Sequence, residues 1–329
     1  MPTHPPALPT TTGRRRPSAR KHSDTLTALS WNKELNGKNN PEVRRAGHEQ
    51  VRALKPAIVT RQEMWGADRD GRTLFQEDKE GYGLEGELGA DACTATFFDP
   101  RLFAAVRTWN DVRGPKWAQP PTALTLRYRP AGRQAVPFIV LSFHHYYACA
   151  DQRLLEAGAL TAWADKTLQA PSGAHVTLPA LMAGDTNSYP EPGTPGDPPL
   201  PKLADIRNRP HRVHRTYLGP DGKRHMDTRP DRKLRAENLM EDVARYWATA
   251  PHGSPAAVAR TVNACETHGP DARIDRIYAT PDLLPAITGV DVIEVPAHLS
   301  DHHIVRLKLS SAVLTDILQD HYRRHWDVG

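Results

Sequence analysis

Short apolar segments that end in turn-forming or polar residues recur along most of the 329-residue chain, and they favour a fold built on β-sheets. Thirty prolines and 22 glycines separate these segments. Because both residues mark turns and loops, we expect long connections between strands and not a helical bundle. No period of 20–50 residues recurs, which excludes a repeat protein. Strands are predicted at 26–31, 56–60, 93–98, 102–108, 122–129, 137–143, 176–183, 273–279, 290–295 and 303–309. Helices are predicted at 42–54, 151–168 and 236–247 and over the last 18 residues.

The bulk composition is that of a globular protein, with 39% hydrophobic and 25% charged residues. No run approaches the 18 apolar residues of a membrane span, and the N-terminus lacks the apolar stretch of a secretory signal. Cys93, Cys149 and Cys265 are widely spaced and show no paired metal-binding pattern, so we read them as reduced thiols. We therefore expect a cytoplasmic protein that does not associate with membranes and is a monomer.

Charge is unevenly distributed along the chain. Residues 1–23 carry five Arg or Lys and no acid, and their Pro- and Thr-rich composition predicts a disordered basic tail. Residues 24–329 are expected to form a single domain that contains a basic insertion at about 190–235. Within that insertion, residues 205–235 hold ten Arg or Lys against four Asp. The rest of the domain is consequently acidic, as expected if carboxylates gather around a metal ion.

Five of the predicted strands end on, or carry, a side chain that can bind a metal or transfer a proton. Loops at strand ends are where rigid scaffolds present functional groups. Carboxylate and amide oxygens suit a hard cation such as Mg²⁺ or Mn²⁺, which keeps water molecules for a substrate phosphate. Histidines add proton transfer, and an Asp–Asn pair adds hydrogen bonds to developing charge. The side chains concerned are Asn32, Glu63, His144, Asp185, Asn187, Asp275, Asp301 and His302.

Each of these residues, taken singly, also has an ordinary structural interpretation. Asn32 could cap a turn, Glu63 could be a surface carboxylate, and residues 184–187 could form an Asx-type turn. Asp275 could pair with a neighbouring arginine, and residues 300–302 could cap a helix. Their shared placement at strand ends favours one site over five unrelated structural roles.

Six segments in chain order resemble the motifs of the endonuclease/exonuclease/phosphatase superfamily, which includes deoxyribonuclease-I-like proteins. The resemblance covers about 24–309. It implies an α/β (α+β) fold, namely a four-layer α/β/β/α sandwich of two mixed sheets flanked by helices. The segments are Leu29–Asn32, Ile58–Glu63, Val140–His144, Ala183–Asn187, Arg273–Ile277 and Leu299–His303.

The resemblance also implies a Mg²⁺ (or Mn²⁺) site. Glu63 is similar to the principal metal ligand of the family, and Asn32 to its partner at the end of the first strand. Asp301 resembles a carboxylate that ligates the metal or orients the imidazole of His302. Asp275 would support the site by hydrogen bonding.

The remaining motif residues are implied to act on water and phosphate. Asp185 resembles the residue that orients or deprotonates the attacking water, and Asn187 would hold that residue and the phosphate in place. His302 would contact the phosphate or transfer a proton. The family has one histidine directly after the strand at 137–143. Counting along that strand favours His144 for this role, with His145 packing or contacting substrate.

The sequence leaves the substrate less defined than the reaction. We expect a nuclease acting on DNA or RNA, with Arg207, Arg212 and Arg215 of the basic insertion binding phosphates. The same insertion could instead be a solvated loop. The enzyme would then be a phosphatase or phosphodiesterase for an inositol phosphate, a nucleotide or a lipid headgroup. Tyr146 and Tyr147 could stack on a base or sugar, or pack at a sheet edge. An inactive binding module is disfavoured because the motif set is complete.

Overall fold

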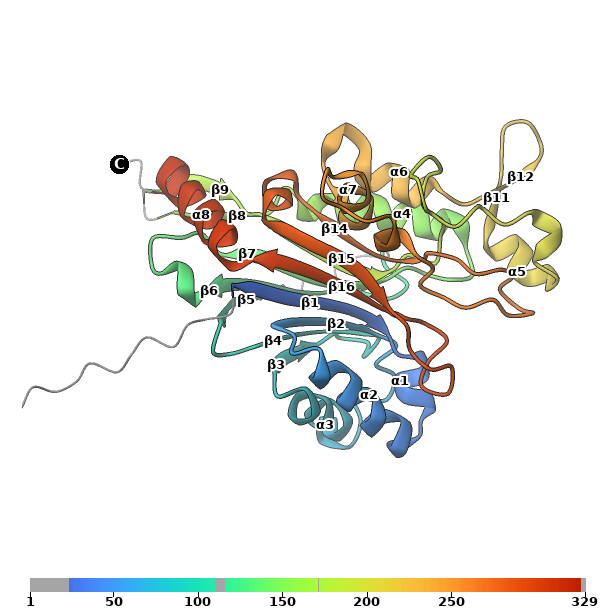
Figure 1. The fold of residues 1–329 in the computed structure, drawn as a ribbon, viewed down its shortest axis with the longest axis horizontal. Helices are drawn as coiled ribbons and strands as arrows, with labels where there is room; N and C mark the ends of the chain where they lie inside the picture. Colours follow the sequence, from blue (N-terminus) through green and yellow to red (C-terminus); the bar gives the residue numbers. More distant parts are fainter. Residues whose placement is uncertain (1–23, 110–115, 171, 327–329) are drawn as a thin grey trace, which may run out of the picture.

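Two six-stranded mixed sheets pack face to face and carry most of the buried apolar side chains (Figure 1). The computed structural model describes residues 24–109, 116–170 and 172–326. The predicted disordered tail at 1–23 lies outside the described residues. Helices cover the outer face of each sheet, which confirms the four-layer α/β/β/α sandwich. Among the described residues, no helix has the length and apolar character needed to cross a membrane.

The first sheet contains the N-terminal strand and has the strand order β15-β16-β1-β2-β4-β3. Side chains alternate along β1: Leu26 and Ala28 join the core shared with the second sheet, whereas Leu29 and Trp31 join the core under the helices. The same alternation places Asn32, the last residue of β1, on the face toward the second sheet. The strands are β1 (Thr25–Asn32), β2 (Ile58–Gln62), β3 (Glu85–Leu88), β4 (Thr94–Phe98), β15 (Ile287–Ile293) and β16 (Ile304–Ser310).

The second sheet has the strand order β13-β14-β10-β7-β6-β5. Its central pair, β7 and β10, is parallel, and its other pairs are antiparallel. All residues of β7, β10 and β14 are buried. These strands therefore fix the positions of whatever side chains lie at their ends. The strands are β5 (Phe103–Trp109), β6 (Thr122–Tyr128), β7 (Phe138–His144), β10 (Ala180–Asp185), β13 (Glu241–Asp242) and β14 (Asp275–Ala279).

Helices α2 (Pro41–Ala53) and α3 (Thr73–Tyr82) cover the first sheet, and α4 (Ala150–Leu160), α6 (Arg229–Arg235) and α7 (Val243–Thr249) cover the second (Figure 1). Helix α2 begins where the sequence predicts, because Pro41 suits a first helical turn and the Asn40 side chain accepts a hydrogen bond from the Glu42 N–H. A short turn, α1 (Glu34–Lys38), connects β1 to α2, and α8 (Ser311–His321) follows the last strand.

Several predicted elements differ from the structure. The helix predicted at 236–247 begins only at Val243, because Glu241–Asp242 pair with β14 as an edge strand and the Asp242 side chain caps α7. The strand predicted at 176–183 is two strands, β9 (His175–Thr177) and β10, separated by Pro179, which has no N–H for a ladder. The helix predicted at 151–168 ends near Trp163 and is followed by β8 (Thr167–Gln169). Helix α3 and strand β3 were not predicted.

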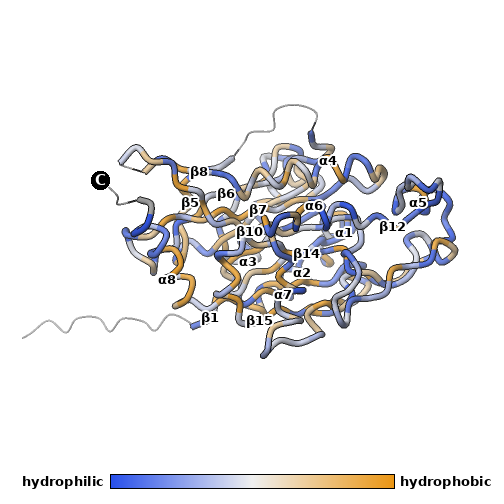
Figure 2. Tube along the Cα trace, turned by 90° about the horizontal axis from the view of Figure 1, so that it is seen from above, coloured by the Kyte–Doolittle hydropathy of each residue, from blue (hydrophilic) through white to orange (hydrophobic). Residues whose placement is uncertain are grey.

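The segment 190–235 contains α5 (Arg209–His214), the hairpin of β11 (Thr216–Leu218) and β12 (Arg224–Met226), and α6. The C-terminal end of this segment, helix α6, is packed into the domain, because its Asp231 is fully buried. Asp231 accepts hydrogen bonds from the Tyr278 hydroxyl at 2.7 Å and from the Glu191 N–H at 2.7 Å. Helix α5 and strand β12 project beyond the end of the sandwich at which β1 terminates (Figure 1). This projecting part is mostly hydrophilic, in contrast to the apolar interior (Figure 2).

Candidate active site

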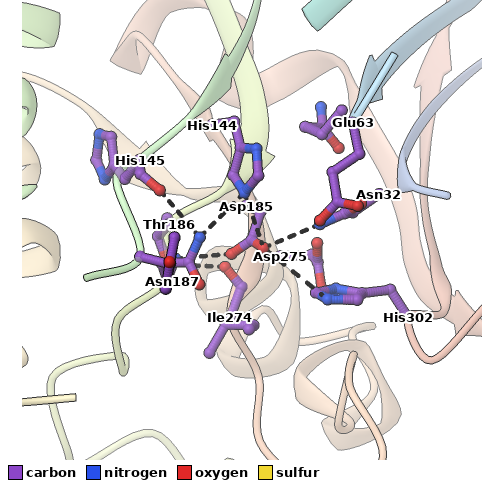
Figure 3. Close-up of polar contacts among 12 residues, drawn as sticks. Asn32, Glu63, His144, His145, Asp185, Thr186, Asn187, Ile274, Asp275 and His302 are labelled. Carbon is purple, nitrogen blue, oxygen red and sulfur yellow. Dashed lines mark hydrogen bonds and ion pairs between the residues drawn. The ribbon is translucent and has the colours of Figure 1, made fainter. Parts of the chain in front are cut away.

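Strand register aligns three of the predicted site residues across the second sheet. Asp185, the last residue of β10, lies opposite His144 on the parallel neighbour β7 and opposite Asp275 on the antiparallel neighbour β14. Neighbouring strands are separated by about 4.8 Å, so these side chains meet without any loop having to bring them together. The sheet alone therefore determines the centre of the site (Figure 3).

The first sheet supplies Asn32 and Glu63 from the ends of β1 and β2. The Asn32 side-chain amide donates hydrogen bonds to Glu63 Oε1 at 3.2 Å and to Asp185 Oδ2 at 3.1 Å, so it links the two sheets. A second hydrogen bond links the two sheets, since Gln62 Nε2 of β2 donates to Ser142 Oγ of β7 at 3.0 Å. Glu63 has φ +57°, and its second oxygen accepts the Leu35 N–H at 2.7 Å, which fixes the carboxylate.

Asp275 and His302 form a buried pair, with His302 Nδ1 2.8 Å from Asp275 Oδ2. The loop that carries His302 is attached to β1, since Trp31 Nε1 donates to the His302 carbonyl at 3.2 Å. Burial opposes a positive charge on this imidazole, but contact with the Asp275 carboxylate and the nearby Asp185 raises the pKa of His302 to about 10. Asp301 Oδ1 lies 4.0 Å from His302 Nε2. Of the two roles expected for Asp301, orienting the imidazole therefore belongs to Asp275.

The turn after β10 holds Asp185 and Asn187 against each other. The Asn187 N–H donates to Asp185 Oδ1 at 2.7 Å, and its left-handed backbone, with φ +47°, turns the side chain toward β7. There Asn187 Nδ2 donates to the His145 carbonyl at 2.9 Å and lies 3.0 Å from His144 Nε2. Although burial works in the opposite direction, the adjacent His144 and His302 hold the pKa of Asp185 well below its usual range. Asp185 is thus an ionised, buried carboxylate at the centre of the site.

The structure separates the two adjacent histidines. His144 Nε2 lies 3.6 Å from Asp185 Oδ2, and Nδ1 lies 3.2 Å from Cys93 Sγ, a contact that the sequence did not predict. The His145 ring points away from Asp185 (Figure 3). It packs on Phe143, with ring centroids 4.9 Å apart. It is 1% exposed. Burial and the Arg153 guanidinium lower the pKa of His145 to about 3. Of the two roles expected for His145, packing agrees with the structure, because its side chain does not line the pocket. Its backbone supports the site: the His145 N–H donates to the Asp185 carbonyl at 2.9 Å, and its carbonyl accepts from Asn187.

A pocket of about 300 Å³ opens over these residues. Of the three arginines predicted to bind phosphate, only Arg215 lines it. The Arg207 side chain is 81% exposed and lies 3.9 Å from Glu266, and Arg212 donates to the Ile206 carbonyl at 3.0 Å. The structure thus places Arg207 and Arg212 outside the pocket. The lining residues are Glu63, His144, Tyr147, Asp185, Asn187, His211, Arg215, His268, Asp301 and His302.

The oxygen atoms around the pocket fit a divalent cation. Asn32 Oδ1 and Asp301 Oδ1 are buried and accept no hydrogen bond from the described residues. Each such oxygen costs about 1–3 kcal/mol when it is left unpaired, and a cation would satisfy it. Asp185, Asp275 and His302 add further polar groups, since one polar atom of each lies within 4.8 Å of the others. Oxygen-rich donor sets of this kind suit Mg²⁺ or Mn²⁺.

A sandwich of two mixed sheets with carboxylates, amides and imidazoles at adjoining strand ends agrees with the architecture that the sequence motifs imply. The defining pattern of the Endonuclease/Exonuclease/phosphatase family matches residues 31–302, and the chain belongs to this family. Members of the family are typically hydrolases of phosphoesters and generally use a divalent metal. No curated protein matches the sequence.

Solved structures with the same fold share little sequence with this chain. An endonuclease/exonuclease/phosphatase family protein from Bacteroides thetaiotaomicron is 15% identical, with a TM-score of 0.56 over 87% of this chain and 94% of its own. An AP endonuclease from Archaeoglobus fulgidus is 15% identical, with a TM-score of 0.57 over 86% and 98%. D. rerio TDP2 complexed with a single-strand DNA product is 15% identical, with a TM-score of 0.54 over 87% and 99%. At these identities the likeness concerns the fold alone.

Proposed function

We propose that this protein is a divalent-metal-dependent phosphodiesterase that cleaves a P–O bond of DNA or RNA by in-line attack of water. One observation carries the proposal: the ionised Asp185 carboxylate lies between two imidazoles and accepts hydrogen bonds from Asn32 and Asn187. A buried carboxylate that stays ionised and is fixed at both oxygens is suited to orient a water molecule for in-line attack.

Glu63, Asn32 and Asp301 would hold Mg²⁺ or Mn²⁺ at the edge of the pocket. When bound, the ion neutralises charge on the phosphate and the leaving oxygen. Side chains of the protein orient the water and bind the phosphate. Asn187 fixes the direction of the Asp185 carboxylate, because its N–H binds one of the two oxygens at 2.7 Å.

The two imidazoles have different parts in this mechanism. Asp275 keeps His302 protonated, so the His302 ring presents a positive N–H at Nε2 to a phosphate oxygen or a leaving oxygen. His144 faces the same space from the other side of Asp185 and is positioned to stabilise charge that develops on the phosphate. Each ring is held at Nδ1 by a buried partner, Asp275 or Cys93, which fixes its orientation.

The second candidate function is hydrolysis of a small phosphoester. It is favoured because arginines of the basic insertion are already bonded to carboxylates of the chain. Arg232 donates to Glu191 at 2.8 Å, and Arg229 binds both Asp227 and Asp151. These cations are therefore less available to a nucleic acid backbone than their number suggests. Arg215 and the exposed Tyr147 in the pocket support the nuclease proposal.

The experiment is a metal-dependent activity screen over plasmid DNA, single-stranded DNA, RNA and small phosphoesters. Activity should vanish in EDTA and return with Mg²⁺ or Mn²⁺, with nucleic acid as the preferred substrate. Full activity in chelator would contradict the metal-dependent mechanism. Hydrolysis of small phosphoesters alone would place the second candidate first.

A further inference from the structure

One side of the active-site pocket is a wall of flat side chains that the proposed reaction does not use. We call Tyr147, His211, His214 and His268 the ring wall. Tyr147 follows β7, His211 and His214 belong to α5, and His268 lies in the loop before β14. His211 contacts all three other rings, with centroids 6.5 Å from Tyr147, 5.3 Å from His214 and 4.6 Å from His268. Three separate segments thus converge on one surface, and Tyr147, His211 and His268 line the pocket.

The histidines of the ring wall are neutral at pH 7. Burial and the Arg215 guanidinium lower the pKa of His268 to about 4 and also hold the pKa of His211 below its usual value. Burial and the cations Arg153 and Arg215 do the same for His214. Uncharged planar rings offer π-faces for stacking, and Tyr147 is 49% exposed at the mouth of the pocket.

Arg215 lies beside these rings and has unused hydrogen-bonding capacity. Its side chain is 5% exposed, and its NH1 group is buried with no acceptor among the residues that the structure describes. A buried guanidinium nitrogen without an acceptor is costly, and a phosphate oxygen is a suitable partner. The pocket therefore combines a cation for a phosphate with ring faces next to it.

The segments of the ring wall that carry Tyr147 and His214 are held in place by Arg153 of α4, which is fully buried. Its guanidinium donates to the Tyr147 carbonyl at 2.8 Å and to the His214 carbonyl, and it binds Asp227 Oδ2 at 3.0 Å. The Asp227 N–H in turn donates to the Arg215 carbonyl at 3.1 Å. Because these segments are already fixed to one another, a ligand that stacks on the rings pays little ordering entropy.

We propose that Arg215 and the ring wall form a nucleoside subsite that selects substrates with an unpaired base next to the cleaved phosphate. This rests on the proposed phosphodiesterase function. Arg215 binds a phosphate, and the adjoining base stacks on Tyr147 and His211. In a duplex both faces of that base are already stacked within the helix, so only an unpaired base is free to lie on the wall. The substrate class is thus single-stranded nucleic acid.

The test compares a single-stranded oligonucleotide, the same sequence as a blunt duplex, and methyl p-nitrophenyl phosphate as a small phosphodiester. The parent protein should cleave the single strand in preference to the duplex. Tyr147→Ala and His211→Ala should each raise KM for the single strand about tenfold, on the scale of one lost stacking contact. Hydrolysis of the small diester should stay within about twofold of the parent.

His225→Ala is the matched control for His211→Ala, because His225 lies on β12 of the same projecting segment but does not line the pocket. It should leave all three activities unchanged. Tyr147→Trp keeps a stacking face and should retain the parent KM, which a purely structural role for Tyr147 would not predict. Circular dichroism of each variant checks folding.

Equal cleavage of duplex and single strand by the parent, or an unchanged KM in both ring variants, would overturn the subsite. Hydrolysis of the small diester with no cleavage of either oligonucleotide would also overturn it, while the phosphoesterase function would stand. If none of the substrates is hydrolysed in a metal-dependent reaction, the proposed function itself is refuted.

Discussion

His302 Nδ1 lies 2.8 Å from Asp275 Oδ2, across 27 residues of sequence, whereas the adjacent residue Asp301 does not contact that nitrogen. Asp275 is on β14, in the second sheet, and His302 is on the loop that leads into β16 of the first sheet. The imidazole of His302 is therefore oriented by a residue of the opposite sheet. Asp275 and Asp301 consequently have different roles, the first in orienting His302 and the second in holding the metal.

Asp275→Ala should lower turnover about 10- to 100-fold with little change in the metal concentration needed, because it releases the His302 ring. Asp301→Ala should have the reverse signature, raising the half-saturating Mg²⁺ concentration about tenfold and leaving turnover at saturating metal less affected. Metal titrations of phosphodiester hydrolysis measure both quantities. If the two variants behave alike, the assignment of separate roles fails.

Asp185→Asn should lower turnover by at least about 100-fold, because the amide keeps the shape of the side chain but lacks the negative charge that orients or deprotonates the attacking water. Its fold should be preserved, as judged by thermal unfolding. Near-normal turnover in this variant would show that another group activates the water.

His144→Ala and His145→Ala should affect different properties. The first should lower turnover about 100-fold, because His144 faces Asp185 in the pocket. The second should lower the free energy of unfolding by about 2 kcal/mol through loss of a buried ring, with a much smaller effect on turnover. Kinetics and urea unfolding of both variants measure the contrast, and the opposite ranking would reverse the assignment of the site histidine.

The buried Asp231 should make the free energy of unfolding depend on pH. Although burial acts in the opposite direction, the Arg276 cation and hydrogen bonds from Glu191 and Tyr278 hold the pKa of Asp231 below its ordinary value of 3.8. A carboxylate with a depressed pKa contributes stability at pH values above its ordinary pKa and loses it as the pH falls below that value.

In Asp231→Asn, the free energy of unfolding should accordingly change less between about pH 5 and pH 3 than in the parent. Urea unfolding at several pH values measures these slopes. Parallel slopes in the two proteins would mean that Asp231 does not contribute in this way.

Much of the site was predictable because its signals are local. The two-residue period of β1 determines that Asn32 shares a face with Leu26 and Ala28, and thus points toward the second sheet. In the same way, an apolar strand that runs directly into Gly184 and Asp185 indicates where that side chain emerges. Pattern and motif order were therefore sufficient for the four-layer fold, the polar residues at strand ends and most strands of the two sheets, but not for the edge strands β3 and β13.

The rest depends on contacts between segments that are distant in sequence. Nothing near Arg215 distinguishes it from Arg207 or Arg212; only the docking of the insertion through Arg153 and Asp227 turns it into the pocket. Likewise, the choice between Asp275 and Asp301 was set by strand register across two sheets. Periodicity reports which face of its own element a side chain occupies. It contains no information about which element lies opposite, so only tertiary packing decided the partners of His302 and the composition of the ring wall.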